Sequence, residues 1–256
     1  MRGAKRTRHL ARAAMVLVAT CGLAGPMAAA HATEAGFGPV DPWEGANRGV
    51  FGFNMTLDRY LIQPVARFYR GNVPDVMRLA LSNFLDNLRT PVILANDLLQ
   101  GDLERANTTV GRFLVNSTFG GLGLVDLAGA EGMVKHKEDF GQTLAVYGIG
   151  TGPYIMLPLF GPSNARDAVG TVVDILFDPA TYLAGGIINV ARTGTEAVDN
   201  RSEVLAETDS LEATALDYYA TIRTLYSQNR DFEIANGESA VLPDILDEEL
   251  DLEPAE

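Results

Sequence analysis

A run of glycines within residues 147–170 is the part of the sequence that looks most like a ligand-binding loop. It reads YGIGTGPYIMLPLFGPSNARDAVG, with Gly148, Gly150 and Gly152 in alternation. A phosphate-binding P-loop places a lysine and a serine or threonine directly after its last glycine, but here Gly152 is followed by Pro153 and a tyrosine. A dinucleotide-binding fingerprint needs a third glycine at position 153, which the proline occupies. The pattern therefore excludes both kinds of nucleotide site.

Histidine chemistry is limited to one side chain. His9 and His31 fall within an N-terminal segment that we expect to be removed on export, which leaves His136. Lys135 and Lys137 flank it, and they disfavour a protonated imidazole without supplying a carboxylate to orient the ring. We expect a surface histidine. A zinc site is not expected, because its usual histidine and cysteine ligands are missing.

Pairs of carboxylates are the remaining candidates for acid–base chemistry. Glu138 with Asp139, and Asp174 with Asp178, have spacings that permit it. Such pairs most often lie on solvated helix faces, and we expect the same here. The sequence contains neither a G-x-S-x-G nucleophile motif nor an H-E-x-x-H zinc motif. We therefore predict a protein that is not an enzyme and that uses no metal or cofactor.

The centre of the chain differs from the rest because it carries no charge. Phe140–Ala165 is a stretch of 26 residues without Asp, Glu, Lys or Arg. It is long enough to cross a bilayer, but Pro153, Pro158 and Pro162 exclude a regular membrane-crossing helix. Two interpretations stay open: the stretch is buried in a water-soluble helical domain, or it lies in the plane of a membrane without spanning it.

The N-terminus reads as an export signal over residues 1–32. Five basic side chains and no acid precede the uncharged segment Ala13–Gly25, and Ala30–Ala32 has the small-x-small pattern cut by signal peptidase. A bilayer-spanning helix needs about 20 apolar residues, so this shorter segment is not expected to remain as an anchor. The alternative is acylation of Cys21, whose lipobox departs from the usual pattern at Thr20.

Charge and cysteine content limit the partners of the exported chain. Removal of the signal changes the formal charge from −13 to −18, which disfavours electrostatic binding to nucleic acid and to anionic lipid surfaces. Cys21 is the only cysteine, so an export signal cut after residue 32 leaves no disulfide. Residues 238–256 carry eight acidic and no basic side chains. We expect a disordered, solvated tail; the alternative is a docking segment for a basic partner.

Helix signals run through most of the exported chain, whereas strand signals are scarce. Asp41–Glu44 predicts a helix start with a capping box, because aspartate accepts a bond from a free N–H and proline is tolerated at the first helical position. Thr90–Pro91 is expected to end a helix over Asp75–Arg89. Further helices are predicted at Leu103–Thr118, Ala165–Leu176, Thr181–Asn200 and Leu211–Asp231. The sequence predicts an all-α protein with one domain over residues 33–237.

Short motifs spread over the chain resemble those of a known family. They are Asp41–Arg48 followed by Phe51 and Asn54, Gln63–Val65, Leu81–Phe84, Leu99–Asp102, Arg112–Phe113 with Asn116 and Gly120, Phe140–Leu144, Tyr147–Tyr154, Leu157–Pro158, Gly161, Arg166–Asp167, Tyr226, Arg230–Phe232 and Ala235–Gly237. In this order and register, the motifs are similar to those of the MlaA (VacJ) family of outer-membrane proteins.

The resemblance implies a fold and a function. It implies a helical, ring-like protein that lies in the membrane plane, in the inner leaflet of the outer membrane, bound to a trimeric porin. Its implied function is to remove phospholipids from the outer leaflet, pass them through a central polar channel and deliver them to a periplasmic lipid carrier of the MlaC type. Members are usually lipidated, which makes Cys21 the candidate attachment site. A structural porin-associated envelope protein without lipid transfer is the alternative.

Polar residues within or near the uncharged stretches are candidates for the lipid path. A lipid head is costly to bring into hydrocarbon, so a path should offer it polar groups. The candidates are Asn116, Gln142, Thr143, Tyr154 and Arg166. A guanidinium can hold a lipid phosphate with two hydrogen bonds; the alternative for Arg166 is a pair with Asp167 at a helix start. All five residues also fit a purely structural role in building the ring.

Overall fold

The computed structural model describes residues 41–183 and 185–236. The predicted signal over residues 1–32, the candidate attachment site Cys21 and the acidic segment 238–256 lie outside the described residues. Within them the chain is predominantly helical, as predicted, with one short antiparallel hairpin.

The elements follow one another with short connections. They are α2 (Glu44–Leu57), a π-helical turn (Asp58–Ile62), α3 (Gln63–Asn72), α4 (Asp75–Gln100), α5 (Leu103–Thr118), α6 (Leu127–Ala130), α7 (Phe140–Val146), β1 (Tyr154–Leu157), β2 (Gly161–Asn164), α8 (Ala165–Phe177), α9 (Pro179–Leu183), α10 (Gly185–Glu203), α11 (Leu205–Thr214) and α12 (Tyr218–Ile234). In the hairpin, Tyr154 pairs with Asn164 and Leu157 with Gly161.

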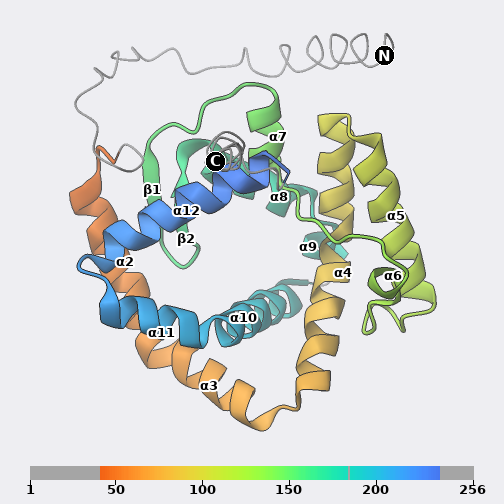
Figure 1. The fold of residues 1–256 in the computed structure, drawn as a ribbon, viewed down its shortest axis with the longest axis horizontal. Helices are drawn as coiled ribbons and strands as arrows, with labels where there is room; N and C mark the ends of the chain where they lie inside the picture. Colours follow the sequence, from red (N-terminus) through yellow and green to blue (C-terminus); the bar gives the residue numbers. More distant parts are fainter. Residues whose placement is uncertain (1–40, 184, 237–256) are drawn as a thin grey trace, which may run out of the picture.

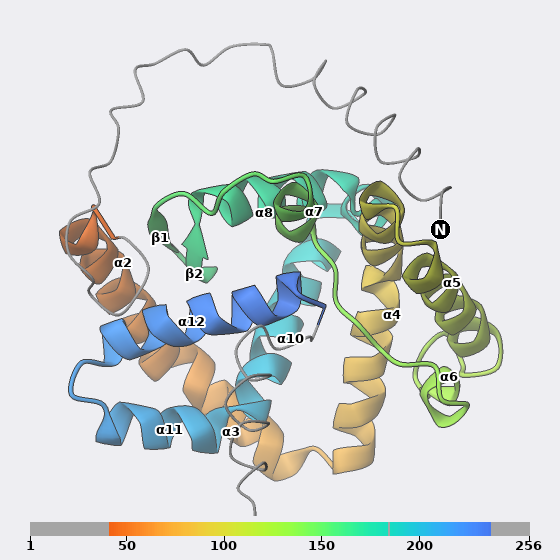
Figure 2. The ribbon, with the colours of Figure 1, turned by 45° about the horizontal axis from the view of Figure 1, so that its top comes forward.

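The helices form a ring around a central region (Figure 1). In this view α2 and α3 make one side and α4 makes the opposite side. The hairpin, α7, α8 and α12 lie along one edge between them, and α10 and α11 lie along the other. α5 and α6 pack on the outer side of α4, and the tilted view shows the same arrangement (Figure 2). The ring that the family resemblance implied is therefore present in the fold.

The prediction that Thr90–Pro91 ends a helix is wrong. α4 continues through Pro91 to Gln100, because packing against α5, α7 and α10 outweighs the hydrogen bond that proline cannot donate. It ends instead at Gly101, whose positive φ of 76° is the usual left-handed end of a helix. Asp102 then caps α5 by accepting from Arg105 N at 3.0 Å, and α5 has the predicted bounds.

Each of the predicted helices Thr181–Asn200 and Leu211–Asp231 spans parts of two helices in the structure. The first span covers the end of α9 and most of α10. The second is interrupted between α11 and α12, where Asp217 caps α12 by accepting from Ala220 N at 3.1 Å. A capping aspartate is thus the reason that helical periodicity does not continue across residues 215–217.

The predicted capping box at Asp41–Glu44 is also absent. The residue before α2 is Trp43, and it makes no side-chain capping bond. Asp41 instead accepts from Asn47 Nδ2 at 2.7 Å, from Arg223 Nη1 at 3.2 Å and from the Tyr219 hydroxyl. Its carboxylate therefore joins the start of α2 to α12 across the sequence.

Large apolar side chains are unusually exposed in this ring. Val76 is 79% exposed and Ile187 is 88% exposed, and others of this kind lie on α3, α4, α8 and α10. The buried apolar core is small and centres on Tyr154, Met156 and Tyr219. Large exposed apolar patches mark surfaces that contact another protein or a membrane. Among the helices of the described residues, none combines the length and apolar character needed to cross a membrane.

α7 and α8 approach each other closely enough to require glycine. A Cβ atom on Gly170 of α8 would collide with the backbone of Gly141 in α7. A Cβ atom on exposed Gly194 in α10 would have no such neighbour within 4 Å. Packing therefore requires a glycine at position 170 but not at position 194, so the two helix positions can be compared by the same substitution.

We predict that Gly170→Ala lowers the free energy of unfolding by about 1–3 kcal/mol, because the methyl group overpacks the contact between α7 and α8. Gly194→Ala should leave stability unchanged or raise it by up to about 1 kcal/mol, since alanine is the better helix former. Denaturant unfolding followed by circular dichroism measures both. Equal effects of the two substitutions would contradict the close approach.

Candidate functional site

The glycine-rich loop joins α7 to the hairpin and contacts the start of α8. Gly152 has a positive φ of 68° and helps the chain turn between α7 and the hairpin. Arg166 N donates to Thr151 O at 3.1 Å, so the loop folds back onto the start of α8. Asn164 caps that helix by accepting from Asp167 N at 2.8 Å. Within the loop itself, Gly148 N and Ile149 N donate to carbonyls of α7.

Two asparagines of α2 hold the hairpin in place. Asn47 donates to Tyr154 O at 3.1 Å and accepts from Met156 N at 2.9 Å. Asn54, seven residues further on the same helix face, donates to Leu157 O and accepts from Leu159 N, both at 2.9 Å. Each amide therefore replaces a strand partner along the hairpin. Sequence analysis included both residues in the family motif but assigned them no role, although their spacing placed them on one helix face.

A buried guanidinium joins α12 to α7 and α8. Arg230 binds both oxygens of Asp139 at 2.6 Å, and it binds Asp167 at 2.8 Å through Nε and 3.0 Å through Nη2. Asp139 also caps α7 by accepting from Gln142 N at 3.0 Å. The Tyr226 hydroxyl donates to Asp167 at 2.6 Å. We call Arg230, Asp139 and Asp167 the arginine clasp.

The clasp keeps all three of its members charged. Burial alone would raise the pKa of Asp139 and of Asp167, but the hydrogen bonds and charge of Arg230 outweigh it, and both pKa values are lowered. Burial disfavours the charged guanidinium as well, yet the two carboxylates raise the pKa of Arg230. Removal of one partner from such a buried pair typically costs about 3–5 kcal/mol.

The expectation that the carboxylate pairs lie on solvated helix faces is therefore wrong. Asp139 belongs to the clasp, and Glu138 is buried against Arg105 Nη1 and Gln100 Nε2. Burial is the main reason that the pKa of Glu138 is raised. Asp174 accepts from Phe140 N at 3.0 Å and has its pKa raised, mainly by burial. These carboxylates bind helix ends, basic side chains and an amide.

Asp178, the second member of the other pair, is buried as well and forms an ion pair with Arg192. Groups of three or more potential metal-binding side chains are absent among residues 41–183 and 185–236.

His136 is not a surface residue, which corrects the expectation from its lysine neighbours. Its side chain is 9% exposed, and Nε2 lies 3.0 Å from Asp97 Oδ1 and 3.2 Å from Thr109 Oγ1. A catalytic triad uses one ring nitrogen for the carboxylate and the other for the hydroxyl. Here one nitrogen faces both groups, and Thr109 is itself buried. The cluster therefore cross-links α4, α5 and the segment before α7 without forming a triad.

Three of the predicted lipid-path residues lie inside the protein with partners of their own. Asn116 donates to Asp126 Oδ1 and accepts from Ala128 N, both at 2.9 Å. Gln142 donates to the carbonyl of residue 137 at 3.2 Å. Thr143 donates to the side chain of residue 96 at 2.8 Å. All three are buried, and their contact with lipid stays a prediction.

The other two predicted path residues each have an unpaired polar atom. Tyr154 is 1% exposed and packs edge-on against Tyr219 and Tyr226, and its hydroxyl has no hydrogen-bond partner within the described part of the chain. Arg166 Nε binds Asp167 Oδ1 at 2.9 Å, as the helix-start alternative predicted. Its Nη2 is buried without a partner among the same residues. Tyr154 begins β1, and Arg166 lies in the first turn of α8, which begins directly after Asn164, the strand partner of Tyr154.

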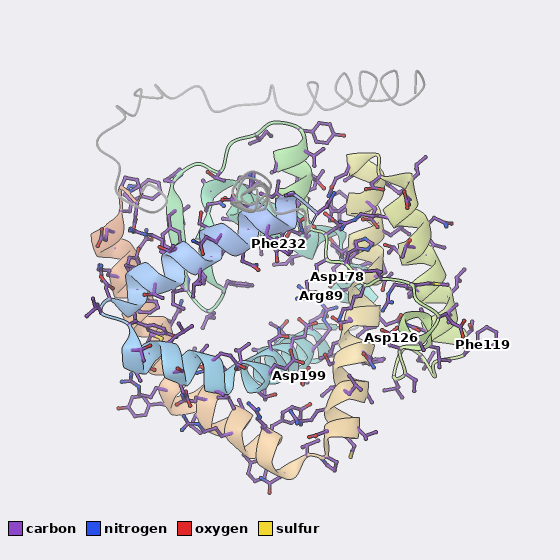
Figure 3. All side chains as sticks on the ribbon, viewed as in Figure 1. Arg89, Phe119, Asp126, Asp178, Asp199 and Phe232 are labelled. Carbon is purple, nitrogen blue, oxygen red and sulfur yellow. The ribbon has the colours of Figure 1, made fainter. Side chains whose placement is uncertain are left out.

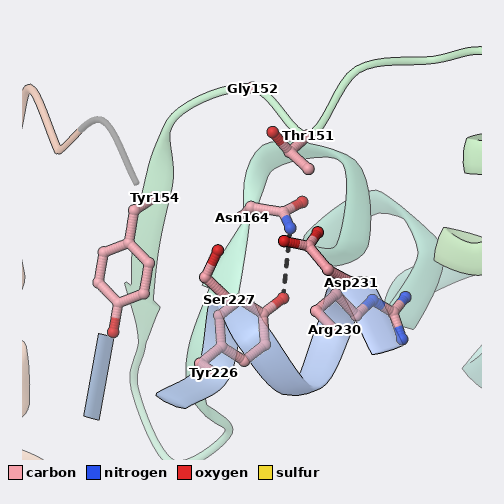
Figure 4. A pocket seen from close by; sticks show the side chains of 8 residues that line it. All are labelled: Thr151, Gly152, Tyr154, Asn164, Tyr226, Ser227, Arg230 and Asp231. Atoms are coloured by element: carbon pink, nitrogen blue, oxygen red, sulfur yellow. Dashed lines mark hydrogen bonds between the residues drawn. The ribbon is translucent and has the colours of Figure 1, made fainter. Parts of the chain in front are cut away.

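A small cavity lies between the loop, the hairpin and α12 (Figure 4). Tyr154, Asn164, Tyr226 and Arg230 are among its lining residues. Its volume of about 30 Å³ is enough for one or two water molecules and too small for any part of a lipid.

Charged side chains lie beside the centre of the ring, where α4, α9 and α10 meet. Figure 3 places Arg89 and Asp178 at this margin, whereas Phe119 points away from the ring on its outer side. Arg89 is exposed, and Asp178 forms its ion pair with Arg192 of α10 here. Sequence analysis missed Arg89 and Arg192, because no local pattern shows which helix face lines the centre.

α10 carries a stripe of polar side chains whose hydrogen bonds are incomplete. Asn189, Arg192 and Glu196 follow each other at helical spacing. Asn189 Oδ1, Glu196 Oε1 and two nitrogens of Arg192, Nε and Nη1, have no hydrogen-bond partner among the residues that the structure describes. We call these three residues the α10 polar stripe.

The family of the chain follows from its match to a family model over residues 39–233, described as MlaA lipoprotein. The chain belongs to the MlaA lipoprotein family. The matched region begins before α2 and ends within α12, so it includes the ring, the hairpin and the arginine clasp of this MlaA-family protein.

Named relatives support the same family assignment. A Shigella flexneri protein named "Intermembrane phospholipid transport system lipoprotein MlaA" is 38% identical over 204 residues, which cover 78% of this chain and 80% of the relative. A protein of the same name from Escherichia coli K12 is 37% identical with the same coverage. A solved structure described as "Structural basis for maintenance of bacterial outer membrane lipid asymmetry" matches with a TM-score of 0.69 and 35% identity. It covers 76% of this chain and 98% of that one.

The arginine clasp should make stability depend on acid. Because folding lowers the pKa of Asp167, its stabilisation is complete above the unfolded aspartate pKa of about 3.9 and is lost as the pH falls through the lower folded value. Asp167→Asn should therefore be less stable at neutral pH and lose less stability on acidification, as measured by denaturant unfolding at a series of pH values.

Asp75→Asn, which removes a 92% exposed carboxylate side chain, is the matched control and should keep the acid slope of the unaltered protein. The raised pKa values of Glu138 and Asp174 act in the opposite direction, but both groups are present in every chain compared. An acid slope in Asp167→Asn as steep as in the control would contradict the clasp.

Proposed function

We propose that this chain is a non-enzymatic phospholipid transport protein that maintains outer-membrane lipid asymmetry. It removes phospholipids from the outer leaflet, passes them through the centre of the ring and delivers them to a periplasmic lipid carrier of the MlaC type. Its location is the inner leaflet of the outer membrane, where it binds a trimeric porin. The names of its relatives, intermembrane phospholipid transport system lipoproteins, support the transport role.

The contrast between the outer surface and the centre of the ring carries this proposal. Phe119 points outward and is 79% exposed, whereas charged Arg89 and Asp178 stand beside the centre (Figure 3). Apolar surface is stable against lipid tails, and a charged lipid head needs polar partners when it leaves water. The arrangement thus suits a ring that sits in one leaflet and gives a lipid head a polar path.

The α10 polar stripe is the proposed contact for the lipid phosphate. Arg192 forms ion pairs with Asp178 and, through Nε at 3.9 Å, with Glu196, but its Nε and Nη1 make no hydrogen bond within the described residues. A phosphate oxygen would complete the hydrogen bonds that these residues leave unmade. Burial of an unpaired polar group costs free energy, which a passing head group would relieve. The candidates Asn116, Gln142, Thr143, Tyr154 and Arg166 remain proposed path residues, and their bonding within the wall supports an indirect role for most of them.

A structural porin-associated protein that moves no lipid is the alternative function. The exposed apolar side chains of α8 and α10 would serve equally as a protein contact. That function leaves the incomplete hydrogen bonds of the α10 polar stripe unexplained, because a purely structural protein needs no polar atoms that lack hydrogen bonds. The two functions differ in what happens to surface phospholipid when the chain is missing.

Deletion of the gene should raise the amount of phospholipid in the outer leaflet, measured by labelling of surface-exposed phospholipid in whole cells. The unaltered chain should restore the low level, and Arg192→Gln should not, since it removes the cation of the α10 polar stripe. Lys135→Gln, which removes an exposed cation that pairs with Asp86, is the control and should restore it. Unchanged surface phospholipid in the deletion strain would refute transport and favour the structural alternative.

Attachment to the membrane through acylated Cys21 is proposed because the named relatives are lipoproteins. Cleavage of the signal after Ala32 would remove this cysteine and leave the apolar surface as the membrane contact. Intact mass spectrometry of the mature chain distinguishes the two: the proposal predicts a lipid-modified N-terminus at Cys21, and a chain beginning near Thr33 would refute it.

A further inference from the structure

A second, larger cavity lies between α2, the π-helical turn, the tip of the hairpin and residues of α10, α11 and α12. Its volume is about 290 Å³. Met55, Ile62, Phe160 and Ile222 are among the apolar side chains that line it. Figure 1 shows the hairpin tip beside the centre of the ring, on its α2 side. The cavity is therefore part of the wall next to the proposed lipid path.

The charges that line this cavity are already paired. Arg201 binds Asp58 through Nε and Nη2, each at 2.9 Å, and donates through Nη1 to Thr208 Oγ1 at 2.5 Å. A phosphate or an acidic peptide would have to displace Asp58 to reach the guanidinium, at the cost of leaving a carboxylate unpaired. An uncharged, apolar ligand disturbs neither group. The chemistry of the lining thus selects a hydrocarbon chain over a head group.

The hairpin tip presents apolar side chains at the cavity in an unusual backbone conformation. Leu159 has a positive φ of 69°, which a leucine rarely adopts, and Asn54 Oδ1 holds its N–H at 2.9 Å. Leu159 is 68% exposed and its neighbour Phe160 is 62% exposed, although both line the cavity. Strained residues of this kind are concentrated at ligand sites. The exposed side chains of Leu159 and Phe160 are therefore available to contact an apolar ligand in the cavity.

We propose that this cavity binds one acyl chain of a phospholipid while its head group lies at the centre of the ring. An apolar cavity of about 150 Å³ holds benzene, so a cavity of about twice that volume accommodates a chain segment of roughly ten carbons. This inference rests on the proposed function, because it is the passing lipid that supplies the chain. It assigns the acyl chain and the phosphate to separate parts of the wall, the cavity and the α10 polar stripe.

The test uses the full-length protein in vesicles of phosphatidylethanolamine and phosphatidylglycerol that contain a phospholipid with a diazirine near the end of one acyl chain. After illumination, peptide mass spectrometry should find the label around Met55 and Ile222 as well as on the exposed face of α4. Met55→Trp fills the cavity and should lose the label around Ile222 while α4 keeps it. Met77→Trp makes the same change on exposed α4, and it should keep the cavity labelled.

Ile222→Trp fills the cavity from its other side and should lose the label around Met55. This variant replaces Met55→Trp if circular dichroism shows that Met55→Trp does not fold. Label confined to α4 in the unaltered protein, or unchanged cavity label in a folded filled variant, would overturn the acyl-chain site even if deletion raises surface phospholipid. Cavity labelling that is lost on filling would support the site even if deletion leaves surface phospholipid unchanged, which would refute only transport.

Discussion

The two-carboxylate contact of Arg230 is the interaction on which the ring depends most. Its guanidinium lies between Asp139, which caps α7, and Asp167, in the first turn of α8, and it extends from α12 near the end of the described chain. A Cβ on Gly141 would come within 2.5 Å of Arg230 Nη2 and Asp167 Oδ1, so the backbone itself is fitted around the ion pairs. Because a broken buried pair leaves an uncompensated charge, this one contact couples helices that are distant in sequence.

Polar side chains join many of the helices of this protein, whereas a large apolar core holds the elements together in most proteins. Asn47 and Asn54 fix the hairpin to α2, and the cluster of Asp97, Thr109 and His136 joins α4 to α5. Hydrogen bonds between neighbouring elements hold the ring together while many apolar side chains stay exposed, where water would disfavour them and lipid would not. This explains how a ring with a small apolar core can present exposed apolar side chains as well as charged groups near its centre (Figure 3).

Features that depend on local sequence were predictable, and features that depend on distant partners were not. The bounds of α5 follow from Asp102 and a continuous helical period. Pro91 misled because helix-breaking is a local tendency that packing against other helices overrides. His136 and Asp97 are 39 residues apart, so no local pattern could show that they meet. The polar stripe of α10 was hidden for the same reason, since its role depends on which face borders the centre.

The central claim, that phospholipid enters this ring, is most directly tested on the protein as it leaves the membrane. Native mass spectrometry of the chain released with the proposed porin partner from outer membranes should detect bound phospholipid. Arg192→Gln should reduce that bound fraction without detaching the porin, because the substitution removes a proposed head-group contact. A complex in which the porin is retained and the unaltered chain carries no phospholipid would contradict the account.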